Sequence, residues 1–188
     1  GRYEIISLSG SFHGRTLATV AATGQPKFHQ GFEPMPIGFV HADFGDPDEL
    51  EKFINPTTCA ILCEPLQGES GVRPLEPEYL QQIRNLCDKH NLLLIFDEVQ
   101  TGMGRTGRLF AYQHFGIEPD IMTLAKALAN GLPIGAMLAR ETIAAAFGPG
   151  SHASTFGGAP IVTAAALEVS KILVEEGTIE SGRAAGAY

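Results

Sequence analysis

Two charged residues in this sequence each end an apolar run. Asp97 follows LLLIF, and Lys126 follows IMTLA. A buried carboxylate needs a partner, so Asp97 is either a helix cap, a member of a core ion pair, or a fixed charge that keeps a proton on a heterocycle nitrogen. A lysine in an apolar site has its pKa lowered by desolvation and becomes nucleophilic, although a surface lysine with a buried stem has the same pattern.

Taken together, the two residues indicate a more specific chemistry. The interval between them fits one helix and loop plus a strand, which would bring both to the same edge of a sheet. A lysine that forms a Schiff base and an aspartate that pairs with a ring nitrogen are what pyridoxal 5'-phosphate (PLP) requires. The protonated ring then accepts electrons from the substrate carbon that loses its proton.

The segment GMGRTG supports a competing hypothesis, because Gly102, Gly104 and Gly107 spell the GxGxxG pattern of dinucleotide-binding loops. That pattern needs its first glycine directly after a strand and a helix N-terminus beneath the phosphates. Here DEVQT intervenes, and its acidic pair would repel a pyrophosphate. The following strand also lacks the acidic residue that would bind a ribose. We therefore interpret GMGRTG as a turn, which argues against a dinucleotide-dependent dehydrogenase.

Two further segments carry side chains suited to a cofactor site. Phe12 in SFHGRT could stack on a cofactor ring, and Arg15 could bind a carboxylate through two parallel hydrogen bonds. Ser154 and Thr155 in GSHASTFGG offer hydroxyls beside glycines, a composition suited to a phosphate contact. In isolation, a core position explains Phe12 and a surface position explains Arg15 better than a cofactor site does, and an ordinary turn explains Ser154 and Thr155 equally well.

Apolar runs and helical patterns alternate along the chain, which predicts an α/β fold with a mostly parallel sheet. Several runs are continuously apolar, as expected of strands covered by helices on both faces. The expected strands are Tyr3–Leu8, Ile37–Val40, Cys59–Cys63, Leu92–Phe96, Ile121–Leu124 and Gly135–Ala139. The expected helices are Asp46–Ile54, Glu78–His90 and Pro160–Glu176. Neither repeats nor linkers are visible, so we expect one domain with its site at the carboxyl ends of the strands.

Composition excludes several function classes. The chain has 188 residues, is 44% hydrophobic and carries a net charge of −8, which argues against nucleic-acid binding. Its apolar runs are too short to span a membrane, and its first residues lack a signal-peptide pattern. Three cysteines without a CxxC motif fit buried thiols in a reducing cytoplasm. The histidines form no metal-binding pattern.

Six segments, spread from Ser11 to Gly158, together resemble the class-III, fold-type I PLP-dependent aminotransferases. The segments are SFHGRTLATVAATGQPKF, CEPLQGESGV, LCDKHNLLLIFDEVQTGMGRTGRLFAYQHFG, PDIMTLAKAL, LPIGAMLA and GSHASTFGG. The family's phosphate-binding Ser-Gly-Thr/Ala segment would precede Gly1, and its small C-terminal domain would follow Tyr188. We therefore expect residues 1–188 to be a fragment of the family's large, PLP-binding domain. Ala153 and Ala159 depart from the glycine and asparagine that relatives often have.

The resemblance implies a role for each matching residue. Lys126 would be the Schiff-base lysine and proton shuttle, Asp97 would pair with the ring nitrogen, and Glu64 would face the reacting centre. Around the cofactor, Val99 and Phe12 would pack on opposite faces of the ring and Gln100 would lie beside its phenolic oxygen. Substrate contacts would come from Arg15, which would bind the α-carboxylate, and from Glu69, which would pair with an arginine of the C-terminal domain. Ser154 and Thr155 would bind the cofactor phosphate of the other subunit of a homodimer.

The implied reaction moves the terminal amino group of an ω-amino donor to 2-oxoglutarate. The favoured donor is N2-acetylornithine, which would place the protein in arginine biosynthesis in the cytoplasm. Ornithine, succinylornithine, acetyl-lysine and 4-aminobutyrate stay open as donors, because the segment that shapes donor choice would lie before Gly1. An alternative of another class is that residues 1–188 alone are an inert fragment without activity.

Overall fold

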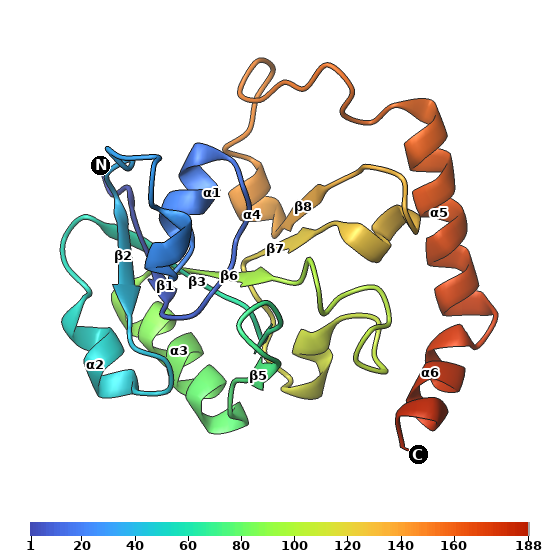
Figure 1. The fold of residues 1–188 in the computed structure, drawn as a ribbon, viewed down its shortest axis with the longest axis horizontal. Helices are drawn as coiled ribbons and strands as arrows, with labels where there is room; N and C mark the ends of the chain where they lie inside the picture. Colours follow the sequence, from blue (N-terminus) through green and yellow to red (C-terminus); the bar gives the residue numbers. More distant parts are fainter. Residues whose placement is uncertain (188) are drawn as a thin grey trace. The chain divides into compact units, whose positions relative to one another are not determined.

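A computed structural model describes residues 1–187 of the chain as two compact units (Figure 1). The first unit is Gly1–Asp97, and the second begins at Glu98. Within residues 1–187, no helix is both long and apolar enough to cross a membrane.

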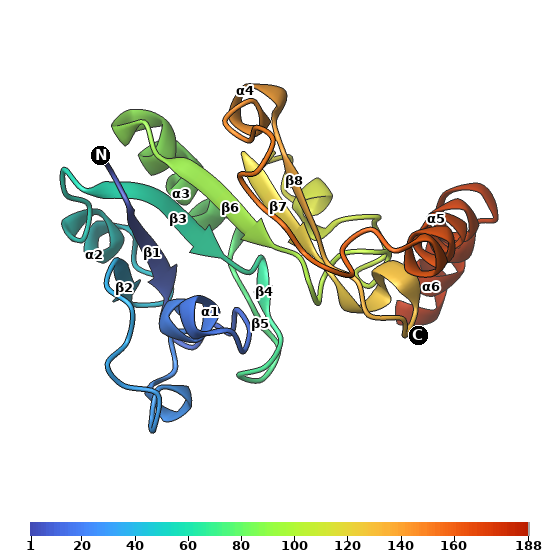
Figure 2. The same ribbon diagram turned by 90° about the horizontal axis from the view of Figure 1, so that it is seen from above.

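The first unit is built on a parallel sheet whose strands lie in the order β2-β1-β3-β6. These strands are β1 (Glu4–Leu8), β2 (Phe39–Ala42), β3 (Thr58–Cys63) and β6 (Leu93–Asp97). Figure 2 shows β1, β3 and β6 running side by side. All four coincide with strands predicted from apolar runs, with ends that differ by one or two residues. Because the strands are parallel, their carboxyl ends share one edge of the sheet.

Helices cover both faces of this sheet, as the continuously apolar strands predicted. Ser7 and Leu62 are register partners and therefore point to the same face, whereas Cys63 points to the other. On the Ser7 face lies α1 (Leu17–Ala22), because the Ser7 hydroxyl donates a hydrogen bond to the Ala22 carbonyl oxygen. On the Cys63 face lies α3 (Pro77–His90), which brings the Cys87 thiol close to that of Cys63.

Local sequence explains where the helices of the first unit begin and end. The Asp46 carboxylate caps α2 (Pro47–Lys52) by accepting hydrogen bonds from two backbone N–H groups of its first turn. Asn91 ends α3 in a left-handed conformation with φ of 52°. The buried face of α3 has helical spacing and comprises Tyr79, Leu80, Ile83, Leu86 and Cys87. Burial of each large apolar side chain contributes about 1.5–3 kcal/mol.

Three short elements in the first unit were not predicted. They are α1, the 3₁₀ turn η1 (Pro26–Phe28) and a small hairpin of β4 (Leu66–Gln67) with β5 (Arg73–Pro74). Each is too short for hydrophobic periodicity to be visible in the sequence. All three belong to segments that follow the carboxyl end of β1 or β3, where the predicted site residues lie.

The second unit contains the strand pair β7 (Ile121–Leu124) and β8 (Ala136–Ala139), the 3₁₀ turns η2 (Ala111–His114) and η3 (Lys126–Ala129), and three helices. The helices are α4 (Glu141–Ala144), α5 (Pro160–Glu175) and α6 (Thr178–Gly186). Its core comprises Met103, Met122, Leu124, Leu128, Ala129 and Ala166. The strand β8 runs antiparallel to β7 because the connection between them is too short for the crossover that a parallel pair needs.

Candidate active site

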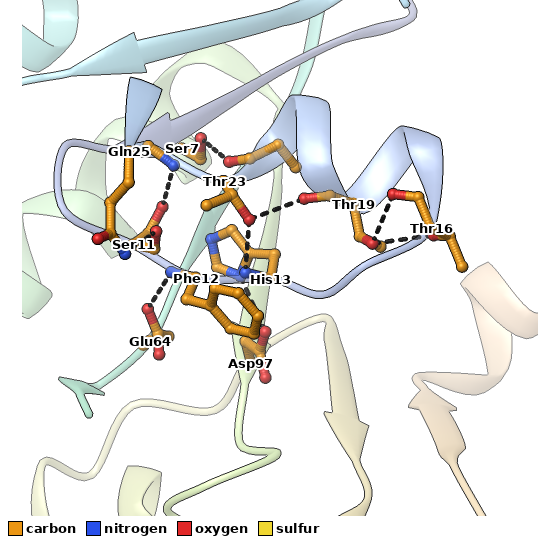
Figure 3. Close-up of polar contacts among 12 residues, drawn as sticks. Ser7, Ser11, Phe12, His13, Thr16, Thr19, Thr23, Gln25, Glu64 and Asp97 are labelled. Carbon is orange, nitrogen blue, oxygen red and sulfur yellow. Dashed lines mark hydrogen bonds and ion pairs between the residues drawn. The ribbon is translucent and has the colours of Figure 1, made fainter. Parts of the chain in front are cut away.

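The carboxyl ends of three neighbouring strands bring predicted site residues together in the first unit. Phe12 lies in the loop after β1, Glu64 directly follows β3, and Asp97 is the last residue of β6 (Figure 3). The backbone N–H of Phe12 donates a hydrogen bond to the Glu64 carboxylate at 2.9 Å. The expected convergence of strand ends is therefore confirmed for these residues.

Asp97 has a partner that the sequence did not reveal. Its carboxylate Oδ2 lies 2.8 Å from Nδ1 of His13, and Asp97 is only 8% exposed (Figure 3). The backbone N–H of His13 in turn donates to the Thr23 hydroxyl at 2.9 Å, which fixes the loop that carries the ring. The other ring nitrogen of His13 is buried and has no hydrogen-bond partner within residues 1–187. His13 therefore orients the Asp97 carboxylate. In the sequence, the only indication of this role was that His13 follows an apolar strand.

Glu64 is a buried carboxyl group, 4% exposed, which holds its proton near neutral pH. Burial raises the pKa of Glu64 to about 7, and the hydrogen bond from the Phe12 N–H opposes this rise without cancelling it. A group with a pKa near 7 can both accept and release a proton at physiological pH. The pKa of Glu64 would therefore suit the proton transfer that its predicted position at a reacting centre implies. That position stays a prediction.

The raised pKa of Glu64 predicts a specific pH dependence of stability. With a pKa of 4.5 in the unfolded chain and about 7 in the folded chain, the protonated group favours folding fully below pH 4.5, and this contribution is lost as pH rises through 7. One pKa unit corresponds to about 1.4 kcal/mol, so the loss is on the order of 3 kcal/mol. Glu64→Gln should remove this decline when unfolding by urea is followed at pH 5 and pH 8.

Glu76→Gln provides the matched control for this measurement, because Glu76 is exposed and its side chain caps nothing. We expect the control to keep the pH dependence of the parent protein. An unchanged pH dependence in Glu64→Gln would contradict the assignment of a neutral-range pKa to Glu64.

Arg15 and Glu69 lie in the same part of the first unit but do not pair with each other. Arg15 is exposed, and its guanidinium carbon lies 4.5 Å from the ring centroid of Phe28 and 5.4 Å from that of Phe12. Glu69 accepts a hydrogen bond from the Gln25 amide at 2.6 Å and lies 3.6 Å from the Lys27 amine. The pairing of Glu69 with an arginine of a C-terminal domain stays a prediction.

Lys126 is exposed, at the start of η3, which is the surface position that the sequence left open for it. Its backbone has φ of 48°, a left-handed conformation that few residues other than glycine adopt. Val72, Asn91, Met103 and Asn130 also have positive φ, so this angle by itself does not assign a role. The role of Lys126 in binding a cofactor stays a prediction.

Val99 and Gln100 are half-buried in the turn that follows Glu98. Glu98 is itself 1% exposed, and its carboxylate accepts hydrogen bonds from the Ala111 and Tyr112 N–H groups at 2.7 and 2.8 Å. Burial raises the pKa of Glu98, while these two bonds act in the opposite direction. Glu98 thereby ties the start of the loop to η2 and holds the turn that carries Val99 and Gln100.

GMGRTG is a turn, as predicted. Gly104 and Gly107 have positive φ of 85° and 80°, and the N–H of Gly107 donates to the Gly104 carbonyl oxygen. A side chain at Gly102 would lie 2.9 Å from both the Glu98 carbonyl oxygen and the Leu124 side chain. These glycines are explained by backbone geometry and close packing, without a nucleotide.

Ser154 and Thr155 are exposed, before α5, and the Ser154 carbonyl oxygen accepts a hydrogen bond from the Gly157 N–H at 3.3 Å. Their contact with a cofactor phosphate stays a prediction.

The predicted site residues are divided between the two units. Asp97 is the last residue of the first unit, whereas the second contains Lys126, Val99, Gln100, Ser154 and Thr155.

Comparison with known proteins extends these observations. Residues 1–188 match the family model of class-III aminotransferases. The chain is 55% identical over 187 residues to acetylornithine aminotransferase of Myxococcus xanthus, covering 100% of this chain and 47% of that protein. It is 52% identical over 170 residues to succinylornithine transaminase of Photorhabdus laumondii, covering 90% of this chain and 42% of that protein.

Among solved structures, the chain resembles an ornithine aminotransferase from Toxoplasma gondii with PLP partly occupying its active site. The TM-score is 0.89 and the identity 37%, covering 95% of this chain and 43% of the other. The chain thus spans less than half the length of the relatives it matches. Because the family model matches residues 1–188, the chain belongs to the class-III aminotransferases.

Proposed function

We propose that the full-length protein is a PLP-dependent aminotransferase that moves the terminal amino group of N2-acetylornithine to 2-oxoglutarate. The observation that carries this proposal is the 55% identity to an acetylornithine aminotransferase over the whole chain. Relatives named for succinylornithine and ornithine keep those donors as alternatives, together with acetyl-lysine and 4-aminobutyrate. With N2-acetylornithine as its donor, the protein would act in arginine biosynthesis in the cytoplasm.

The residues of the chain fit PLP. A buried carboxylate held in one orientation by His13 is suited to a protonated ring nitrogen, and Lys126 presents an exposed amine on a strained backbone. When bound, the cofactor supplies an electron sink for the substrate carbon that loses a proton. We infer that Lys126 attaches the cofactor covalently and that Asp97 holds the proton on the ring nitrogen.

The remaining residues bind, orient or move protons. Lys126 would also move the proton at the terminal carbon of the donor, and Glu64 would be a second group able to carry a proton. Val99, Phe12 and Gln100 would hold the cofactor ring. These assignments follow the family resemblance and agree with the positions of Phe12 and Glu64 at adjoining strand ends.

Two further assignments concern the substrate and the assembly. Arg15 binds a substrate carboxylate, which is consistent with an exposed guanidinium that faces aromatic rings rather than an acidic side chain. Glu69 contributes to substrate binding by pairing with an arginine of the C-terminal domain. Ser154 and Thr155 bind the cofactor phosphate of the other subunit of a homodimer. Residues 1–188 are a fragment of the large domain and are inactive in isolation, since each active site draws on residues outside them.

A comparison of amino donors tests this function. The purified full-length protein, supplied with PLP and 2-oxoglutarate, should form glutamate with the highest kcat/KM on N2-acetylornithine, because a relative that is 55% identical over the chain carries that name. Ornithine and 4-aminobutyrate should be poorer donors, and reactions without 2-oxoglutarate serve as the control. A preference for 4-aminobutyrate would overturn the assigned donor, and absence of transfer from every donor would overturn the activity.

A further inference from the structure

The turn η1 contacts the substrate-binding residues on two sides. Its last residue, Phe28, meets the Phe12 ring edge-on, with centroids 5.4 Å apart, and faces the Arg15 guanidinium at 4.5 Å. On the other side, Gln25 and Lys27 hold the Glu69 carboxylate. One short segment therefore contacts both the cation and the anion that the proposed function assigns to substrate binding.

The surroundings of Arg15 leave its charge available to a ligand. Within residues 1–187, its guanidinium forms no ion pair with a carboxylate, and its contacts are with the faces of Phe28 and Phe12. When a guanidinium lies over an aromatic ring, its face contacts the ring. Its N–H groups point outward in the plane of the guanidinium, where they can bind a planar anion. The ring also limits the rotamers of a long side chain, whose ordering costs up to about 2 kcal/mol on binding.

Phe28 is held in place by its own contacts. Pro26 begins η1, and the N–H groups of Phe28 and His29 donate to the carbonyl oxygens of Gln25 and Pro26. Gln25 is buried and also donates to the Ser11 carbonyl oxygen, which joins η1 to the loop after β1. The platform under Arg15 is therefore fixed to the segment that carries Phe12 and Arg15.

From this geometry we infer that Phe28 is a positioning residue that orients Arg15 and thereby sets the affinity for carboxylate-bearing substrates. The inference rests on the proposed role of Arg15 in the aminotransferase reaction. In this inference Phe28 acts through the guanidinium, which lies 4.5 Å from its ring centroid. Its removal should weaken substrate binding without slowing the chemical step.

Steady-state kinetics of the full-length protein test this inference. Phe28→Leu should raise KM for N2-acetylornithine and for 2-oxoglutarate about 2- to 5-fold, the range expected for loss of an exposed cation–π contact, with kcat changed less than about 2-fold. Phe28→Tyr keeps the ring and should restore the parent KM. Phe32→Leu is the matched control, because Phe32 is 55% exposed and does not contact Arg15, and it should leave KM unchanged.

A double-mutant cycle separates this inference from the proposed function. If Phe28 acts through Arg15, Phe28→Leu should have little further effect on KM in an Arg15→Met background. Additive effects of the two substitutions, or a failure of Phe28→Tyr to restore KM, would overturn the role of Phe28. If Arg15→Met alone left KM unchanged, the assignment of Arg15 within the proposed function would fail instead, and a KM effect of Phe28→Leu would then exclude action through Arg15.

Discussion

Lys126→Ala should abolish transamination by the full-length protein while leaving it folded. The substitution removes the amine that we assign to cofactor attachment and to proton transfer, and proton transfer alone contributes about 10²–10⁴-fold to such a rate. Because Lys126 is exposed, the free energy of unfolding should change by less than about 0.5 kcal/mol. Glutamate formation and urea unfolding measure the two effects independently.

Lys171→Ala is the matched control for this substitution. Lys171 is also exposed, and its amine lies 3.7 Å from the Glu168 carboxylate within α5. No role in the reaction is assigned to it. We expect this variant to retain the activity of the parent protein. Substantial activity in Lys126→Ala, or an equal loss in both variants, would contradict the role assigned to Lys126.

Asp97→Ala should lower kcat by about 10²–10³-fold, the cost of removing one preorganised charged group from an active site, and should weaken PLP binding. The carboxylate is buried and oriented by His13, which suits the proposed role of stabilising a protonated ring nitrogen. Without it, the ring would lose its proton and would stabilise negative charge on the substrate poorly. Turnover at saturating PLP and a PLP titration measure the two consequences.

Two further variants define what Asp97 contributes. Asp88→Asn is the control, because Asp88 is exposed, pairs with Arg84 within α3 and has no assigned role. His13→Asn should cause a smaller loss than Asp97→Ala, because the carboxylate stays while its orientation is no longer fixed. Parent-like turnover in Asp97→Ala would show that the ring nitrogen needs no partner from this position.

Hydrophobic patterns were sufficient to predict most of the elements that position the candidate site. The runs ending at Cys63 and Phe96 are continuously apolar, which indicates buried parallel strands, and these are β3 and β6. The run ending at Leu8 is mostly apolar, and it forms β1. Parallel strands place their carboxyl ends at one edge, so the convergence of Phe12, Glu64 and Asp97 followed from topology. The face of α3 followed from helical periodicity in the same way.

The features that escaped prediction depend on contacts between distant segments or on single backbone angles. The pairing of His13 with Asp97 joins residues from separate strand ends, and no periodicity encodes it. The left-handed backbone of Lys126 is a property of one residue, and no hydrophobic pattern encodes it. The turn η1 is too short to leave a hydrophobic pattern, although it carries the ring beneath Arg15.

The central claim is that Lys126 is the residue to which PLP is attached, and chemical trapping tests it most directly. Borohydride would reduce the lysine–cofactor linkage in the full-length protein saturated with PLP, and peptide mass mapping would then locate the pyridoxyl group. The chain contains five lysines, and we expect the label on Lys126 at one group per chain. Stoichiometric label on any other lysine, or a fully labelled Lys126→Ala variant, would contradict the account.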